Sequence, residues 1–202
     1  MAWNNGAWWP IVVPQWWSPM VSRHPLDPYS LVHFQTGMIF FYIIGIPLWY
    51  CLKGKDKSRP PGSPLPIWHC FKDKQTTPRF DSWHLWIGFG ITFMVSLTFE
   101  IIENLPCIID KYRVVSGNAS DYSGDSYQNI IGDLIVVQLG YMISWAFPSK
   151  GVPWAPAIWF LVIDVWLMLY MRDSALLFFN VFVEHQGIIA WQAEGVAMGK
   201  IR

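Results

Sequence analysis

Charged side chains are scarce in this sequence: Asp, Glu, Lys and Arg make up only 14% of its 202 residues. Soluble domains carry roughly 25% charged residues, whereas 53% of this chain is hydrophobic and 17% is aromatic. An excess of either sign is also lacking, because 14 basic and 14 acidic residues cancel. The composition therefore gives no reason to expect nucleic acid as a partner. It predicts a membrane protein that crosses the bilayer several times.

Cysteine is equally scarce, and familiar catalytic spacings are missing. Cys51, Cys70 and Cys107 form no CxxC or metal-ligand pair. A disulfide between Cys51, at the end of the first predicted helix, and Cys70, in the loop that follows, is the alternative to the free thiols that we favour. The HExxH zinc motif is absent, and Gly124-Asp125-Ser126 lacks the His and Asp order of a hydrolase triad. The sequence thus indicates no particular reaction.

Long apolar runs, in contrast, are plentiful. About 20 apolar residues cross a bilayer core, and the sequence predicts four transmembrane helices at about 29–51, 83–105, 129–147 and 157–171. Residues 175–183 are apolar but too short to span, so we expect a re-entrant or interfacial segment there. The predicted fold class is an all-α membrane protein with four transmembrane helices plus this short C-terminal segment.

The segments around the helices predict an orientation. Residues 1–28 are rich in Trp and Pro, which is typical of an interfacial arm; a docking arm for a neighbouring subunit is the alternative. Residues 53–81 carry seven basic side chains and are therefore expected in the cytoplasm or matrix. With a four-helix transmembrane domain at 29–192 and a tail at 193–202, both termini then lie on the outer side of the membrane, in the periplasm or the intermembrane space.

Two acids end the second predicted helix. Glu100 and Glu103 share one helix face because they are three residues apart. Carboxylates in an apolar run are costly and face a protein interior, and the predicted topology brings further polar residues to the same outer leaflet. The resulting interhelical polar cluster is expected to contain His33, Glu100, Glu103, Asn104, Asp125, Asn129, Asp133, Arg172 and Asp173. Asp164, inside the fourth helix, is expected to face Arg172 or a partner chain.

This polar cluster has three interpretations. The one that we favour is a structural network, in which Arg172 or Arg113 neutralises the acids because buried charges need partners. The second is a divalent metal site, since carboxylates and imidazoles are suitable ligands. The third is a relay that passes protons between carboxylates. The donors weighed for a metal site are His33, Glu100, Glu103, Asp133 and His185, with Glu103, Asp133 and His185 as the main candidates; the candidates for catalysis are Glu100, Glu103 and Asp133.

Several strings of this sequence are similar to those of a known family. They are Glu100-Ile-Ile-Glu103-Asn104, Asp110-Lys-Tyr112-Arg113, Tyr122-Ser-Gly124-Asp125-Ser126 with Asn129 and Asp133, Arg172-Asp173 with Asn180, and Ala190-Trp191-Gln192. On these residues the chain resembles an uncharacterised alphaproteobacterial family of small multipass membrane proteins, over roughly residues 29–192. His33 is similar to a histidine in the first helix of that family. The resemblance implies an inner-membrane location and no known activity.

Two functions from different classes follow. The first, which we prefer, is an accessory subunit of a larger inner-membrane assembly such as a respiratory complex. The second is a membrane enzyme whose acidic and histidine site, with or without a metal, acts on a lipid. We predict no cofactor and expect bound lipids. The expected partners are membrane lipids and other membrane subunits, in a mitochondrial inner membrane or a bacterial plasma membrane.

Overall fold

The chain is built from helices. A computed structural model describes residues 22–48, 83–115, 123–149, 152, 154–172, 174–177 and 183–201, and no β-strand occurs in these ranges. The helices are α1 (Ser30–Phe40), the π-helical turn η1 (Phe41–Gly45), α3 (Trp83–Glu103), α4 (Pro106–Val115), α5 (Tyr127–Ser149), α6 (Ala155–Met171) and α8 (Gln186–Ile201). The predicted all-helical fold class is confirmed.

Three helical segments are long and apolar enough to cross a membrane. They are Ser30–Leu48, Trp83–Glu103 and Tyr127–Phe147, and they coincide with the first three predicted spans. The fourth apolar helix, α6, is shorter, with 17 residues. Most of the predicted N-terminal arm, the basic loop 53–81, Cys51 and Cys70 lie outside the described residues, whereas Cys107 is an exposed free thiol.

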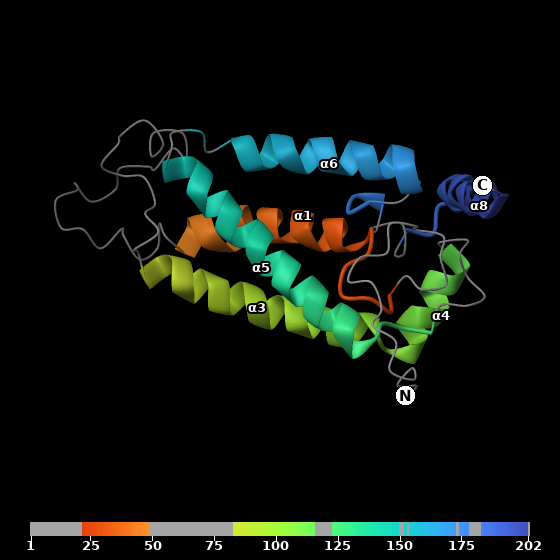
Figure 1. Cartoon of the computed structure of the whole chain (residues 1–202), viewed down its shortest axis with the longest axis horizontal. Coiled ribbons are helices and arrows are strands. Elements are labelled where there is room, and N and C mark those ends of the chain that lie inside the picture. The colour runs from red at the N-terminus through yellow and green to blue at the C-terminus, as the bar shows by residue number, and fades with distance from the viewer. Residues whose placement is uncertain are drawn as a thin grey trace.

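The long helices pack around α1 and α5. Figure 1 shows α5 crossing α1 and α3, with α6 on the side of α1 that is opposite to α3. The contact between α1 and α5 is the most extensive one, and α3 packs on α5. Consecutive long helices run in opposite directions, so α1 and α5 point the same way. The start of α1, the end of α3, the start of α5 and the end of α6 therefore lie together at one end of the bundle, and this end carries the site described below.

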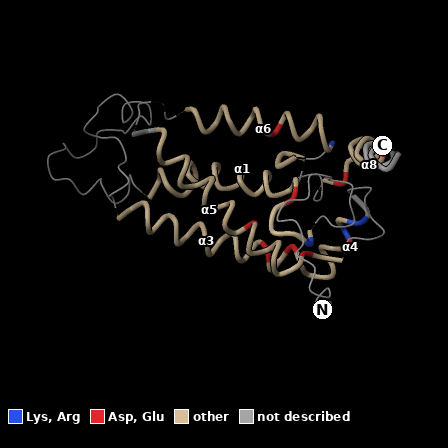
Figure 2. The backbone as a smooth tube through the Cα atoms, in the orientation of Figure 1, with Lys and Arg blue, Asp and Glu red and all other residues tan. Residues whose placement is uncertain are grey.

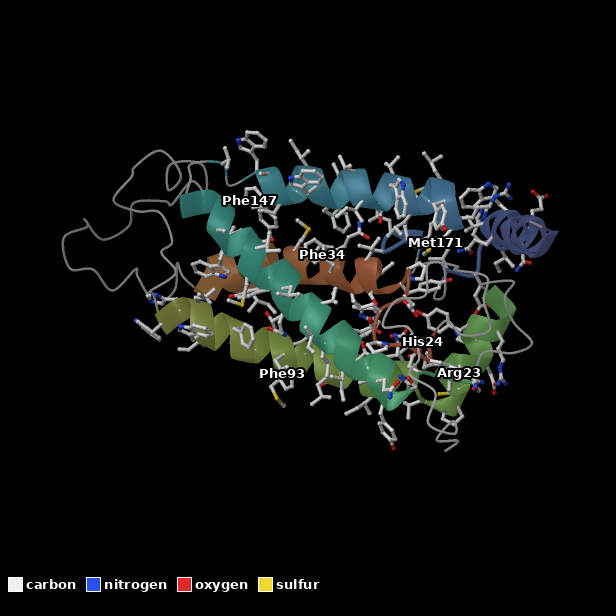
Figure 3. The ribbon with its side chains drawn as sticks, viewed as in Figure 1. Arg23, His24, Phe34, Phe93, Phe147 and Met171 are labelled. Atoms are coloured by element: carbon white, nitrogen blue, oxygen red, sulfur yellow. The ribbon has the colours of Figure 1, made fainter. Side chains whose placement is uncertain are left out.

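Glycines allow α1 and α5 to approach closely. A Cβ atom at Gly37 would collide with the backbone carbonyl of Val137, and one at Gly140 would collide with the carbonyl of Phe34, which is labelled in Figure 3. Small residues at a helix crossing permit this backbone contact within a bilayer. At the far end of the same interface, the Phe41 and Trp145 rings pack edge to face with centroids 5.6 Å apart.

Two helices lie where the sequence predicted none. Helix α4 occupies the start of the polar stretch after Pro106, and α8 extends through most of the predicted tail. Arg172, in a left-handed conformation with φ 54°, ends α6. Its guanidinium donates to the Trp191 carbonyl at 2.7 Å and lies 5.3 Å from the centroid of that indole. Arg172 therefore joins α6 to α8.

Asp164 makes a second polar contact inside the bundle. The Gln35 amide lies 3.5 Å from Oδ1 of Asp164, and the backbone N–H of Leu176 donates to the same oxygen at 3.3 Å. Both Gln35 and Asp164 are buried. Asp164 thus contacts α1 and the short segment after α6, rather than the Arg172 side chain, which was one of the two partners that the sequence suggested.

Candidate metal centre

Three ionisable side chains from three helices meet at the end of the bundle. His33 lies one turn into α1, Glu100 lies in the last turn of α3, and Asp133 lies in the second turn of α5. Nδ1 of His33 is 3.4 Å from Oε1 of Glu100, and Nε2 is 3.7 Å from Oδ2 of Asp133. One ligand atom from each residue lies within 4.8 Å of the others. The structure therefore brings together three members of the predicted polar cluster, and we call them the His33 centre.

The carboxyl groups of this centre are buried. Glu100 and Asp133 are only 1% and 2% exposed. Oε2 of Glu100 is buried without a hydrogen-bond partner, and so is Oε2 of the neighbouring Glu103. Figure 2 shows the acids gathered where α3 ends and α5 begins. Because buried carboxylates require a compensating charge or proton, this arrangement needs either a bound cation or protonated carboxyl groups.

The two predicted neutralising arginines bind elsewhere. Arg113 pairs with exposed Asp110 at 3.0 Å, and Arg172 pairs with exposed Glu194 at 3.3 Å. Among the described residues, His33 is the basic side chain that faces both buried acids of the centre. One imidazole carries at most one positive charge, so it cannot balance several carboxylates. Neither of these two arginine ion pairs involves Glu100 or Asp133.

Asn104 and Asp125 close the α3 side of the centre. The Asn104 amide donates to Oδ2 of Asp125 at 3.1 Å and to the Glu100 carbonyl at 2.9 Å, while the Asp125 N–H donates to Oδ1 of Asn104 at 2.6 Å. Glu103, on the same helix face as Glu100, is hydrogen-bonded by Tyr112 of α4. These predicted cluster residues surround the centre rather than belonging to its group of three.

The remaining predicted residues have different positions. Asn129 is buried, and its amide donates to the carbonyl of His24 at 3.0 Å; Figure 3 labels His24 at this end of the bundle. Arg172 is at the start of the connection to α8. His185, a metal candidate from the sequence, is exposed just before α8 and is not a member of the group of three. Asp173 lies outside the described residues.

A loop that sequence reasoning assigned to the N-terminal arm also reaches the centre. Ser30 donates its hydroxyl to Oδ1 of Asp133 at 2.9 Å. The Ser30 N–H donates to Oδ1 of Asp27, and the Asp27 N–H donates to Oγ of Ser30, both at 3.1 Å. Such reciprocal bonds are typical of the first turn of a helix. The Asp-Pro-Tyr-Ser string before an apolar run is the signal that could have identified them.

Burial also affects Asp27. Desolvation raises the pKa of its carboxyl above the ordinary value. The N–H groups of Ser22 and Ser30 and the nearby His33 oppose this rise without cancelling it. Asp27 therefore holds its proton more tightly in the folded protein than an exposed aspartate does.

The His33 centre has the donor set of a divalent metal site. Two ligands that each lie about 2.1 Å from a tetrahedral ion are about 3.4 Å apart, which is close to the separation of His33 and Glu100 and longer than a good hydrogen bond. Three protein ligands would leave a fourth position open for water or substrate. The same groups can also share protons.

Comparison with known proteins gives a family without an assigned activity. Residues 75–194 match the model of a family described as protein of unknown function (DUF2585). That range includes Glu100 and Asp133 and leaves His33 outside. A UPF0314 protein of Sphingopyxis alaskensis is 30% identical over 112 residues, covering 55% of this chain and 57% of that protein. A UPF0314 protein of Paracoccus denitrificans is 32% identical over 117 residues, which cover 53% of this chain and 55% of that protein. A UPF0314 protein of Brucella anthropi is 30% identical over 153 residues, which cover 76% of this chain and 59% of that protein.

The matched part of the chain thus spans less than two thirds of the length of each of these relatives. No solved structure matches the chain.

Proposed function

Because this chain belongs to the uncharacterised DUF2585 family, we propose a function from its site: it is a multipass membrane protein that binds a divalent metal at the His33 centre and acts on a lipid. The observation that carries this proposal is Oε2 of Glu100, a buried carboxylate oxygen without a partner, in a group of three potential ligands. A bound cation would complete its coordination and supply the missing positive charge.

The donor set limits the metal. One imidazole and two carboxylates suit Zn²⁺, Mn²⁺ or Fe²⁺, whereas Ca²⁺ and Mg²⁺ prefer oxygen ligands throughout. A metal with an open position can polarise a carbonyl group or lower the pKa of a bound water. The role of the chain is to hold the ion between three helices and to keep bulk water away from it.

The surrounding charge limits the substrate. Glu103 lies on the same face of α3 as Glu100, Asp125 is hydrogen-bonded to Asn104 of the same helix end, and both add negative potential. A carboxylate-rich site repels anionic groups, so the reacting group is uncharged, such as the ester carbonyl or hydroxyl of a lipid. A lipid is the substrate class that has direct access to the end of a helix bundle in a membrane.

The proposed topology uses α6 as a fourth span. Its apolar sequence supports insertion, although its 17 residues reach the short end of the usual range. Four spans, with the basic loop 53–81 inside, put both termini and the His33 centre toward the outer leaflet. The bacterial relatives favour a bacterial-type plasma membrane over a mitochondrial inner membrane. Residues 175–183, of which 178–182 lie outside the described residues, remain the proposed re-entrant or interfacial segment.

Thermal unfolding in detergent tests metal binding. We compare the chelated protein with samples that contain Mn²⁺ or Zn²⁺, using His33→Ala as the variant and exposed His185→Ala as the matched control. An ion that binds the folded state at 100 times its Kd adds about 2.7 kcal/mol of stability. We expect this gain in the wild type and in His185→Ala and its loss in His33→Ala. Equal melting temperatures with and without metal would contradict the proposal.

A second assay tests action on lipid. Purified protein loaded with Mn²⁺ or Zn²⁺ is incubated with a bacterial lipid extract, and the lipids are compared by mass spectrometry before and after. We expect a change in one lipid class with the wild type and with His185→Ala, and none with Glu100→Gln. An unchanged extract under all metal conditions would leave the metal site without the proposed activity and would refute the lipid part of the proposal.

An accessory subunit of a larger complex is the second candidate. The observation that favours it is an exposed aromatic strip on α6, which includes Trp159, Trp166 and Tyr170; the last two rings stack with centroids 5.0 Å apart. Aromatic residues are enriched at protein interfaces. A native gel of membranes solubilised in mild detergent distinguishes the candidates, because a subunit migrates with its partners. Migration as a monomer would contradict the subunit hypothesis.

A further inference from the structure

Asp133 accepts a hydrogen bond from the hydroxyl of Ser30, a residue that is not one of the three potential ligands of the His33 centre. Ser30 donates to Oδ1 of Asp133 at 2.9 Å, and the other oxygen, Oδ2, is the one that faces Nε2 of His33. Ser30 is 5% exposed and Asp133 is 2% exposed. The hydroxyl therefore determines which carboxylate oxygen points toward the centre.

Ser30 is itself fixed by Asp27. The two residues exchange backbone and side-chain hydrogen bonds, and Oδ2 of Asp27 accepts a further bond from the Ser22 N–H at 2.8 Å. All three residues are buried. Because Oγ of Ser30 accepts the Asp27 N–H, its hydroxyl hydrogen is directed to Asp133. The rotamer of Ser30 is thus determined by the loop before α1.

This loop contacts α5, and the residue just before α5, at three points. The Ser126 N–H donates to the Ser22 carbonyl at 2.8 Å, and the Asn129 amide donates to the His24 carbonyl at 3.0 Å. A Cβ atom at Gly132 would collide with the carbonyl of Pro25, so the absence of a side chain there lets the loop lie on the helix. The loop and Asp133 are consequently held by the same helix, α5.

We propose that Ser30 and Asp27 are positioning residues of the metal centre, which orient Asp133 so that Oδ2 serves as the metal ligand. This inference rests on the proposed function. Outer hydrogen-bond partners of metal ligands fix ligand orientation, and their loss costs about 10–100-fold in metal affinity. Neither Ser30 nor Asp27 contacts the ion in this arrangement. Their contribution is to reduce the rotational freedom of Asp133 before the ion binds.

Mn²⁺ titration tests the proposal, with the unbound ion measured by electron paramagnetic resonance on the full chain in detergent. We expect Ser30→Ala to raise the Kd for Mn²⁺ about 10–100-fold, and Ser30→Thr, which keeps the hydroxyl, to bind within a few-fold of the wild type. The matched control is Thr36→Ala on the same helix. Its hydroxyl donates to the Val32 carbonyl and not to the centre, so its Kd should not change.

The outcomes separate the two proposals. Wild-type affinity in Ser30→Ala overturns the positioning role while the metal site stands. Failure of the wild type to bind Mn²⁺ or, by competition, Zn²⁺ overturns both. If Ser30→Ala does not fold, Asp27→Asn is the second variant. The NH₂ group of the new asparagine cannot accept the hydrogen bond from the Ser22 N–H, so Ser30 is held less firmly. The Kd for Mn²⁺ should then rise several-fold. An unchanged Kd in Asp27→Asn contradicts the proposal as directly as the serine variant would.

Discussion

Nδ1 of His33 lies 3.4 Å from Oε1 of Glu100, so the first turns of α1 face the last turn of α3 through a basic and an acidic side chain. The same imidazole faces Asp133 of α5 with its other nitrogen. One histidine therefore connects three helices, in addition to their apolar contacts, their close approach at glycines and the Ser30–Asp133 hydrogen bond. This relationship places two buried acids and one histidine together at one end of the bundle.

Glu100→Gln should change stability in opposite directions with and without metal. In chelator, the substitution removes a buried carboxylate that lacks a full set of partners, so the variant should melt at or above the wild-type temperature. With Mn²⁺ or Zn²⁺ the wild type should melt higher, because only it binds the ion. Melting temperatures in detergent measure both effects. If Glu100→Gln is less stable than the wild type in chelator, and the wild type does not respond to metal, the His33–Glu100 pair would be purely structural.

Asp27 should make stability depend on pH. Its pKa is raised in the folded protein, so the folded state binds this proton more tightly than the unfolded state. The resulting stabilisation is complete below about pH 3.9, the unfolded value, and is lost as pH rises through the folded pKa. The melting temperature of the wild type relative to Asp27→Asn should therefore fall from pH 4 to higher pH. A difference that stays constant or rises would contradict the burial of this carboxyl.

Gly37→Ala should weaken the contact between α1 and α5. The added Cβ collides with the Val137 carbonyl, a backbone atom that cannot move without separating the helices. We expect a loss of about 1–3 kcal/mol in the free energy of unfolding. Gly90→Ala is the control, since a Cβ there meets nothing within 4 Å and should be neutral or slightly stabilising. Chemical unfolding in mixed detergent compares the two; equal effects would refute the close approach.

Asn104→Ala should loosen the loop that precedes α5. Asn104 exchanges two hydrogen bonds with Asp125 and donates a third to the Glu100 carbonyl. Their loss should lower the free energy of unfolding by about 1–3 kcal/mol and increase hydrogen exchange at 123–126. Lys111→Ala removes an exposed ion pair with Glu184 and should cost less than about 1 kcal/mol. Similar losses in both variants would show that the Asn104 contacts are not structurally important.

The membrane helices could be predicted from the sequence because their signal is local. Apolar length and the charged or proline boundaries gave the limits of α3 and α6 to within about two residues. The amphipathic α4 was harder to detect, since its ten residues carry too little apolar periodicity to distinguish it from a polar connection. The π-helical turn at Phe41–Gly45 also has no local signal beyond Pro47, whose missing N–H interrupts the usual bonding ladder.

The site could be predicted only in part. The spacing of Glu100 and Glu103 and the alternating direction of the helices were sufficient to place His33 and Asp133 nearby. The choice of partners was not predictable, because it depends on loop conformations that join distant segments. Arg113 and Arg172 pair with other acids, and Ser30 reaches Asp133 only through the fold of the loop before α1. A hydroxyl that donates to a residue on another helix leaves no periodic trace in the sequence.

The central claim is that His33, Glu100 and Asp133 hold a divalent metal ion. X-ray absorption spectroscopy on protein loaded with Zn²⁺, together with elemental analysis, tests it most directly. The account predicts one tightly bound ion per chain with one imidazole and carboxylate oxygens about 2.0–2.2 Å away, retained in His185→Ala and lost in His33→Ala and Glu100→Gln. A wild-type protein that binds no ion, or an ion that remains in both of those variants, would contradict the claim.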